Sequence, residues 1–182
     1  TTCAKIIRLN TNGTVDATFV QGTGFDDNIS ALTTQADGKI IVGGDFLMYN
    51  GAVANRIIRL NLDGSRDTSF NSGVGLSAGT VEVIKVNSTG SIIVGGSFSG
   101  TYNGVDVNRI LLLDSNGVLD PIFDIGAGPA TGTVYALTEE TDGSWYAGGS
   151  FSIFDSQNQG RLAKIDVVGA MDIGYLTAGV GF

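Results

Sequence analysis

Few residues of this chain could carry out chemistry, and they are poorly placed to act together. The 182 residues include no histidine and a single cysteine, Cys3. The sequence therefore lacks Ser-His-Asp and Cys-His catalytic systems, histidine or cysteine metal clusters and an intrachain disulfide. The remaining candidates are two neighbouring carboxylate pairs, Asp26-Asp27 in an expected loop and Glu139-Glu140 on an expected strand.

Neither carboxylate pair predicts a catalytic site. Adjacent residues of a strand point to opposite faces, so Glu139 and Glu140 cannot flank one glycosidic bond as acid and base. Asp26 and Asp27, followed by Asn28, could contact a Ca²⁺ ion, but the loop offers too few oxygen ligands for a complete site. We therefore predict no catalytic residue, no cofactor and no metal centre.

Charge and composition narrow the partners and the fold class. The net charge is −8, which disfavours nucleic acid and anionic membrane surfaces as partners. Apolar runs are short, Ile110–Leu113 being typical, so neither a transmembrane helix nor membrane insertion is expected. With 28 glycines, only two prolines, and more isoleucine and valine than leucine, the composition predicts an all-β protein with many glycine turns.

The elements that must position any site recur along the chain. A Gly-Gly pair ends an apolar string three times, at spacings of 52 and 53 residues: Gly43-Gly44, Gly95-Gly96 and Gly148-Gly149. A second string starts with a basic residue and leads 11 residues later to an aspartate, with an aromatic residue three positions further on. Its four copies begin at Lys5, Arg56, Arg109 and Arg161, and contain Asp16 and Phe19, Asp67 and Phe70, Asp120 and Phe123, and Asp172 and Tyr175. Such a period indicates a repeat architecture.

A unit of about 52 residues accommodates four short strands. The first strand, as in residues 29–35, turns at Asp37-Gly38 into the Gly-Gly strand. The third, as in residues 56–62, turns at Asp63-Gly64 into a short fourth strand. Asn-Gly and Asp-Gly between apolar runs predict two-residue type I′ turns. Two such hairpins give a four-stranded antiparallel sheet, which is typical of a β-propeller blade.

The repeated residues also resemble a known family. Residues 37–46, Asp-Gly-Lys-Ile-Ile-Val-Gly-Gly-Asp-Phe, and 55–70, Asn-Arg-Ile-Ile-Arg-Leu-Asn-Leu-Asp-Gly-Ser-Arg-Asp-Thr-Ser-Phe, are similar to delta-60 repeats, a family of predicted β-propellers. The resemblance covers essentially the whole chain, although Gly160 and Val168-Gly169 depart from the pattern in the last copy. Because such repeats occur in secreted or surface proteins of bacteria and in phage proteins, with no established chemistry, the resemblance implies an extracellular, cell-surface or virion location.

The repeat divides the chain into a half blade and three whole blades. Their bounds are 1–24, 25–76, 77–128 and 129–182. Because propellers close with four to eight blades, we expect this array of about 3.5 blades to be a segment of a larger, seven-bladed propeller. Alone, it would expose sheet edges and an apolar blade face.

Features that recur in every blade are interpreted as structural. The Gly-Gly pair indicates close backbone approach or a bulge, and the recurrent phenylalanines are expected to pack between blades. The expected turn at Asn12-Gly13 places Asp16 opposite Leu9. The recurrent acids should therefore meet basic residues of another blade or cap their own Asp-x-Thr/Ser turns.

Residues that vary between blades are the candidates for ligand or partner contact. Glu82 and Lys85 break the pattern of the first strands, which line the channel of a propeller. Together with Tyr135 of the next blade they are expected to face water in this channel, either as contact residues or as an incidental polar lining. The segments 47–54, 99–107 and 152–159 vary most, and variable loops on a rigid scaffold are common binding sites. In these loops Tyr49, Tyr102 and Phe154 recur, either as loop anchors or as part of a contact surface.

Three functions fit these observations. The first is a non-enzymatic scaffold in an extracellular, surface or virion-associated protein, with an adhesive or structural role and loops presented to a glycan or protein ligand. The second is part of a glycan-active enzyme whose site is completed by other blades. The third is a packing module of a fibre or filament, whose partners would be blades of the same or an identical chain.

Overall fold

The described residues form three antiparallel sheets, and each sheet lies within one predicted blade. The computed structural model describes residues 5–158 and 160–175, so Cys3 and the predicted connector Gly179-Val180-Gly181 lie outside the described residues. The first sheet contains β1 (Ile29–Thr34), β2 (Ile40–Gly44) and β5 (Ile57–Leu60). The second contains β6 (Val81–Val86), β7 (Ile92–Tyr102) and β8 (Val105–Leu113), and the third β9 (Val134–Glu139), β10 (Trp145–Gly149) and β13 (Leu162–Ile165). The all-β prediction is confirmed.

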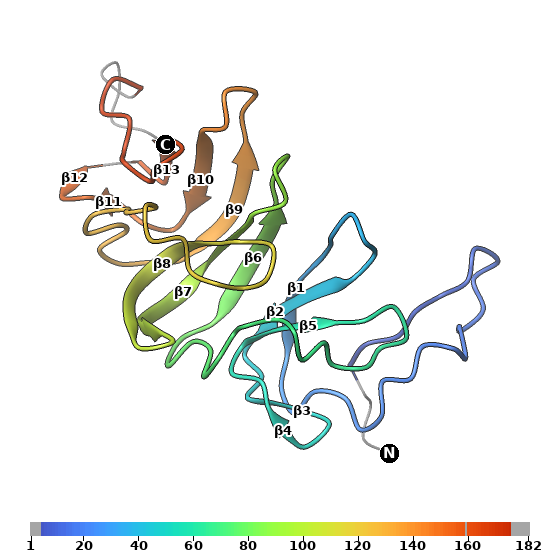
Figure 1. The fold of residues 1–182 in the computed structure, drawn as a ribbon. Coiled ribbons are helices and arrows are strands. Elements are labelled where there is room, and N and C mark those ends of the chain that lie inside the picture. Colours follow the sequence, from blue (N-terminus) through green and yellow to red (C-terminus); the bar gives the residue numbers. More distant parts are fainter. Residues whose placement is uncertain (1–4, 159, 176–182) are drawn as a thin grey trace.

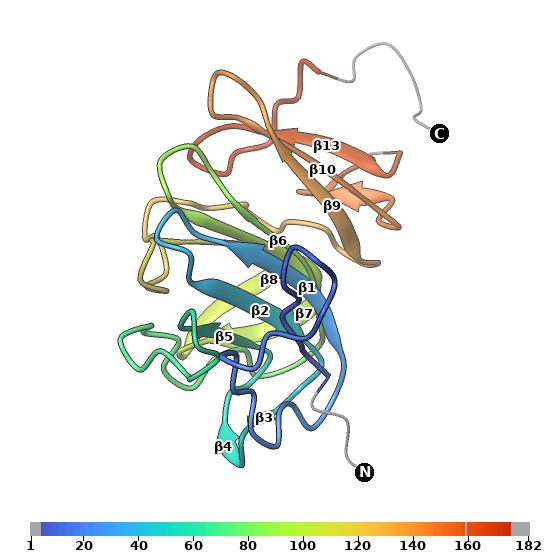
Figure 2. The same cartoon turned by 90° about the vertical axis from the view of Figure 1, so that its right-hand side faces the viewer.

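The sheets follow one another in chain order. Strands β1, β6 and β9 lie side by side, so the first strand of each sheet neighbours the first strand of the next (Figures 1 and 2). In the described residues no helix is long and apolar enough to cross a membrane.

The fourth strand of each blade is reduced to a single bridge. The four bridges are Leu9 with Val15, Leu60 with Arg66, Leu113 with Leu119 and Ile165 with Met171. The chain leaves the sheet after the bridge because the next residue is the recurrent aspartate, which forms a turn. In the first sheet, Oδ1 of Asp67 accepts a hydrogen bond from the Ser69 amide at 2.9 Å. The four-stranded blades predicted from the sequence are therefore three strands with a short fourth segment.

The hairpins within each blade use three-residue loops, and the two-residue type I′ prediction for them is wrong. In the loop after β5, the Asn61 amide donates to the Ser65 carbonyl at 2.8 Å and the Gly64 amide to the Asn61 carbonyl at 3.0 Å. Only the glycine has a positive φ, +84° at Gly64, because the Asp63 carboxylate caps the Ser65 amide and holds Asp63 in a right-handed turn.

The extra loop residue shifts the strand pairing by one position. The bridge between Leu9 and Val15 places Asp16 opposite Arg8 rather than Leu9. The same shift brings Asp67 opposite Arg59. The recurrent acids therefore lie opposite the position three residues after the first basic residue of their own repeat, which is Arg8, Arg59 or Lys164 in three copies and Leu112 in the second blade.

Type I′ turns occur instead between the second and third strands. They lie at Asn50-Gly51, Asn103-Gly104 and Asp155-Ser156, where both turn residues have positive φ. They close the hairpins β3 (Met48–Tyr49) with β4 (Ala52–Val53), the ends of β7 and β8, and β11 (Ile153–Phe154) with β12 (Gln157–Asn158). The segments predicted as variable loops are thus short hairpins.

The hydrophobic core lies between the blades. The core between the first two sheets contains Ile41, Ile57 and Phe70 from the first sheet, and Ile84 and Phe98 from the second. Equivalent clusters join the half blade to the first sheet and the second sheet to the third. Phe46, Phe98 and Phe151 are fully buried. The predicted packing of the recurrent aromatics between blades is confirmed.

Antiparallel strands in chain order give the array two distinct ends. All three-residue turns lie at one end, which we call the turn face. The hairpins 47–54, 99–107 and 152–158 lie at the other end, together with the described Gly-x-Gly connectors 22–24, 73–75 and 126–128; we call this end the hairpin face. In Figure 1 the three hairpins lie along one side of the array.

Candidate functional site

The recurrent aromatic residues of the hairpins are anchors. Tyr49, Tyr102 and Phe154 are each at most 1% exposed, so the alternative that they form part of a contact surface is wrong. The Tyr102 hydroxyl donates to the Gly117 carbonyl at 2.7 Å, and the Tyr49 hydroxyl makes the same bond to Gly64 at 2.5 Å. Burial raises the pKa of Tyr102. These bonds tie the hairpin face to the turn face.

A second contact fixes each hairpin to the connector beside it. Oδ1 of Asn50 accepts from the Gly24 amide at 2.9 Å, and Oδ1 of Asn103 from the Gly75 amide at 3.2 Å. In the third blade Asp155 replaces the asparagine and accepts from the Ala127 amide at 3.1 Å. Each hairpin is therefore held from two sides.

Tyr102→Phe tests the anchor. The substitution leaves the buried Gly117 carbonyl without its donor, so we expect the free energy of unfolding to fall by about 1–3 kcal/mol. Urea unfolding provides the measurement, and Tyr135→Phe, at a side chain that is 58% exposed, is the control with a change of about 0.5 kcal/mol or less. Equal effects in the two variants would contradict the anchor role.

The tips of the anchored hairpins expose aliphatic side chains that differ between blades. Met48 is 44% exposed, Val53 57%, Val105 53% and Ile153 36%. Exposed apolar groups held on a rigid hairpin lose little conformational entropy when a partner binds. The hairpin face therefore combines rigidity with variable apolar contacts.

The three candidate residues of the first strands lie at the surface but do not form a joint site. Glu82 is half-buried at a bulge in the β6–β7 ladder, Lys85 is exposed, and Tyr135 is exposed on the neighbouring strand β9. No hydrogen bond or ion pair joins these three side chains. Burial, followed by the nearby charge of Asp45, raises the pKa of Glu82.

The raised pKa of Glu82 predicts a pH-dependent effect of Glu82→Gln. Because the fold disfavours the charged carboxylate, the stability linked to Glu82 is complete below its unfolded pKa of about 4.5 and is lost as the pH rises through the folded value. We expect Glu82→Gln to raise the melting temperature at pH 7.5 more than at pH 4. The difference should shrink in an Asp45→Asn background, which removes the neighbouring charge. A gain that is the same at both pH values would contradict this explanation.

Asp26 and Asp27 are occupied by local contacts. Oδ1 of Asp26 accepts the amides of Leu47 and Met48 at 2.9 Å each, which ties the loop after β2 to the start of the first blade. Asp27 accepts the amide of Asn28 and lies 3.9 Å from the Lys5 amine. No group of three or more Cys, Asp or Glu side chains in the described chain is arranged to hold a metal ion.

The first basic position of the repeat links consecutive blades through carbonyl groups at Lys5, Arg56 and Arg109. Arg56 donates to the carbonyls of Gly79 and Leu76, at 2.5 and 2.8 Å. Arg109 makes the equivalent bonds to Gly132 and Pro129, both at 2.8 Å. The expected contact between this basic position and a recurrent acid of another blade is not seen at Lys5, Arg56 or Arg109. Lys5 lies 3.9 Å from Asp27, which is not one of the recurrent acids. The alternative, that the recurrent acids cap their own turns, is confirmed at Asp16 and Asp67.

The first sheet contains a buried ionic network that was not predicted from the sequence. Arg59 is 3% and Asp67 8% exposed, and Nε of Arg59 lies 2.7 Å from Oδ2 of Asp67. Lys39 reaches the same oxygen at 2.9 Å. Arg59 also donates to Gln35 and Ser69 of its own blade and to the Ser115 carbonyl of the second blade. Burial opposes ionisation of Asp67, but hydrogen bonds from Lys39, Ser69 and Arg59 hold its pKa well below the usual range. Because Arg59 and Lys39 already contact Asp67, we interpret this cluster as a structural link.

Stacked antiparallel sheets with the core between them define this chain as a β-propeller repeat protein. The chain belongs to the family described as domain of unknown function (DUF5122) beta-propeller, whose model matches residues 1–19, 35–70, 88–123 and 140–172, more than half of its length. The first three matched segments end at the recurrent phenylalanine. No curated protein matches the chain.

Proposed function

We propose that the chain is a non-enzymatic propeller scaffold that binds a protein partner through the hairpin face. The observation that carries the proposal is the double anchoring of the hairpins, which holds Met48, Val53, Val105 and Ile153 exposed at their tips. Rigid apolar side chains that vary from blade to blade suit a specific protein contact.

A protein partner is favoured over a glycan at this face. Sugar recognition commonly uses exposed aromatic rings for stacking, and the aromatic residues of the hairpins are buried. The resemblance to delta-60 repeats supports a location in an extracellular, cell-surface or virion-associated protein with an adhesive or structural role.

Binding arrays with matched variants test the proposal. The labelled chain is applied to an array of purified extracellular proteins and to a glycan array. The double variant Met48→Ser, Val53→Ser alters the hairpin face, and Leu62→Ser, Val118→Ser alters two exposed apolar residues of the turn face. We expect protein binding that the first variant reduces at least tenfold and the second leaves unchanged. Binding to glycans alone, equal loss in both variants, or no binding on either array would overturn the proposal.

A second candidate function rests on Glu82. A half-buried carboxyl with a raised pKa beside a second acid, Asp45, is a feature of acid catalysis in glycan-active enzymes. Release of reducing sugar from glycan substrates, lost in Glu82→Gln, would support this function. Turnover that is unchanged in Glu82→Gln, or no turnover, would contradict it.

A further inference from the structure

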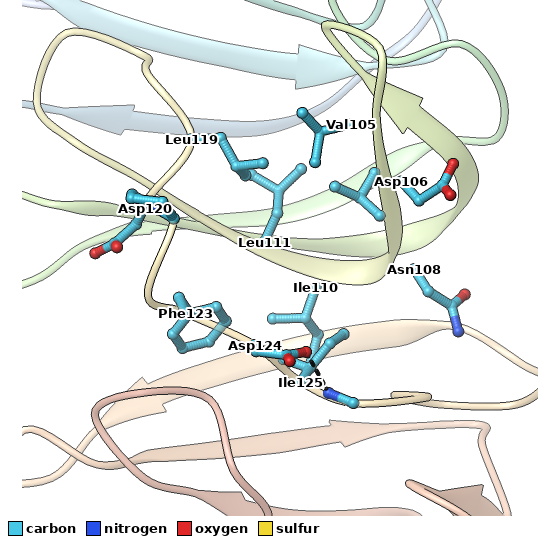
Figure 3. A pocket seen from close by; sticks show the side chains of 13 residues that line it. Val105, Asp106, Asn108, Ile110, Leu111, Leu119, Asp120, Phe123, Asp124 and Ile125 are labelled. Carbon is cyan, nitrogen blue, oxygen red and sulfur yellow. Dashed lines mark hydrogen bonds between the residues drawn. The ribbon is translucent and has the colours of Figure 1, made fainter.

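The outer edge of β8 borders a groove of about 370 Å³ (Figure 3). It is lined by residues 105–108, 110 and 111 of β8 and by residues 119–126 of the segment that follows. Ile110 belongs to the core between the second and third sheets, and Leu111 to the core between the first and second. A cavity that touches residues from both faces of a strand lies against the edge of that strand.

The groove exists because the fourth segment leaves β8 early. After the bridge between Leu113 and Leu119, the Asp120 amide donates to the Leu112 carbonyl at 2.8 Å. Pro121 then has no amide to donate, and Asp120 turns the chain by accepting the Ile122 amide. In the described chain no further backbone hydrogen bond reaches the outer edge of β8 between Val105 and Leu111. A free strand edge can pair with an extended segment.

The first blade shows which chemical group fits such a groove. There the corresponding cavity is lined by Ala52, Arg66 and residues 68–73, the positions equivalent to 105, 119 and 121–126. Arg66 directs its guanidinium to the carbonyl of Val53 on the edge strand β4. In the second blade Leu119 replaces Arg66 and Asp106 replaces Val53. The groove of the second blade thus lacks the arginine that serves the groove of the first.

The charges around the groove are all negative. Asp106, Asp120 and Asp124 line it, and no lysine or arginine does. In Figure 3, Asp120 lies at one end of the groove, and Asp106 lies at the other end with Asn108. The equivalent of Asp120 in the first blade is Asp67, which contacts Arg59 and Lys39, whereas the second blade has Leu112 and Ser91 at those positions.

Apolar side chains form the two walls between these carboxylates. Val105, Leu111 and Leu119 lie on one side, and Ile110, Phe123 and Ile125 on the other (Figure 3). A strand paired with β8 would direct alternate side chains to the two walls, because side chains of a strand alternate between faces.

We propose that this groove binds an extended, arginine-bearing segment of a partner protein by strand addition to β8. Its apolar residues pack against the two walls, and its arginines reach Asp106 and Asp120 at the ends. The groove shares Val105 with the hairpin face. The variants that test the two proposals alter different residues, Met48 and Val53 for the hairpin face and Asp106, Leu119 and Asp120 for the groove, so each proposal can fail without the other.

Fluorescence anisotropy with defined peptides tests the proposal on the unmodified chain. The probe is a labelled peptide of three valines flanked by two arginines. We expect it to bind at least tenfold more tightly than the same peptide with citrulline in place of arginine, which keeps the shape and removes the charge. Methylation of the backbone amides that face β8 should also weaken binding at least tenfold, because it removes the donors of the added strand. Absence of binding, or equal binding of the arginine and citrulline peptides, would overturn the proposal.

Variants of the chain locate the bound peptide. Leu119→Arg restores the arginine of the first blade and should weaken binding at least tenfold, while Asp106→Asn and Asp120→Asn should each weaken it several-fold. Asp37→Asn is the matched control on the turn face, where asparagine keeps the cap on the Lys39 amide and changes the net charge equally. A loss in Asp37→Asn as large as in Asp106→Asn would show non-specific attraction and overturn the assignment.

Discussion

Replacing Arg59 with leucine is expected to lower the free energy of unfolding by about 3–5 kcal/mol, the usual cost of breaking a buried ion pair from one side. Leucine fits the local backbone, since Leu112 occupies the equivalent position of the second blade. The loss comes from Asp67, which keeps only Lys39 as a cationic partner, and from the links of Arg59 to Gln35 and Ser115. Urea unfolding followed by circular dichroism measures the change.

Arg8→Leu is the matched control for Arg59→Leu. Arg8 pairs with Asp16 at 2.9 Å in the same register, but the Arg8 side chain is 33% exposed. Exposed ion pairs contribute about 1 kcal/mol or less, so Arg8→Leu should change stability little. If the two substitutions cost the same, burial of the Arg59 network does not contribute the stability assigned to it.

The lowered pKa of Asp67 adds a pH dependence to this prediction. The stabilisation by the ionised carboxylate is complete above the unfolded pKa of about 4 and is lost as the pH falls toward the lower folded value. Arg59→Leu removes part of that stabilisation at neutral pH. The difference in stability between the original chain and the variant should therefore narrow between pH 5 and pH 2.

The repeated features were predictable because the copies of the repeat can be compared with one another within the same chain. Phe98 and Gly96 recur in every complete blade, so a packing role was the simplest interpretation, and the structure buries Phe98 between two sheets. The strand order followed from the same comparison. The sequence left two roles open for Tyr102, a loop anchor or a contact residue. The choice depends on burial, and burial of this hairpin residue depends on its contact with a turn 15 residues away.

The ionic network was not predicted because the loop at Asp63-Gly64 is one residue longer than the predicted two-residue turn. An Asp-Gly sequence is compatible with a two-residue type I′ turn and with a three-residue loop, and only the cap made by Asp63 decides between them. A shift of one residue changes every cross-strand pair, so the predicted register did not place Asp67 opposite Arg59. The groove of β8 was missed for a related reason, since it depends on a fourth segment that pairs only once.

The Gly-Gly pair provides the second prediction with a large effect, and its two glycines should behave differently. A Cβ on Gly149 would overlap the backbone carbonyl of Thr133. Gly44 and Gly96 meet the carbonyls of Asn28 and Thr80 in the same way. This close approach lies at the bulge between the first two strands of each sheet. Because a backbone carbonyl cannot move aside as a side chain can, the second glycine is required by the fold.

The first glycine of the pair serves the packing of the next blade. A Cβ on Gly43 would meet Val81 and Ile84 of the second sheet. One on Gly95 would meet Val83 of its own sheet as well as Val134 and Leu137 of the third. At Gly148 the nearest atoms are the Ala136 Cβ at 3.8 Å and the Arg161 carbonyl oxygen at 3.9 Å, which are ordinary contact distances. In the third sheet, therefore, only the second glycine, Gly149, has no room for a Cβ. Substitutions in this sheet can distinguish the close approach of the backbone carbonyl from the packing against the next blade.

Gly149→Ala should cost about 3 kcal/mol or more, because the start of β9 must move away from β10. Gly148→Ala, one residue earlier, should be neutral or stabilise the protein by about 0.5 kcal/mol, since alanine loses less backbone entropy in a strand than glycine. Thermal unfolding of both variants under identical conditions gives the comparison. Similar losses in both would mean that the pair is needed for chain flexibility rather than for close approach. A loss confined to Gly149→Ala would assign the requirement to the Thr133 carbonyl, and the same requirement would then apply at Gly44 and Gly96.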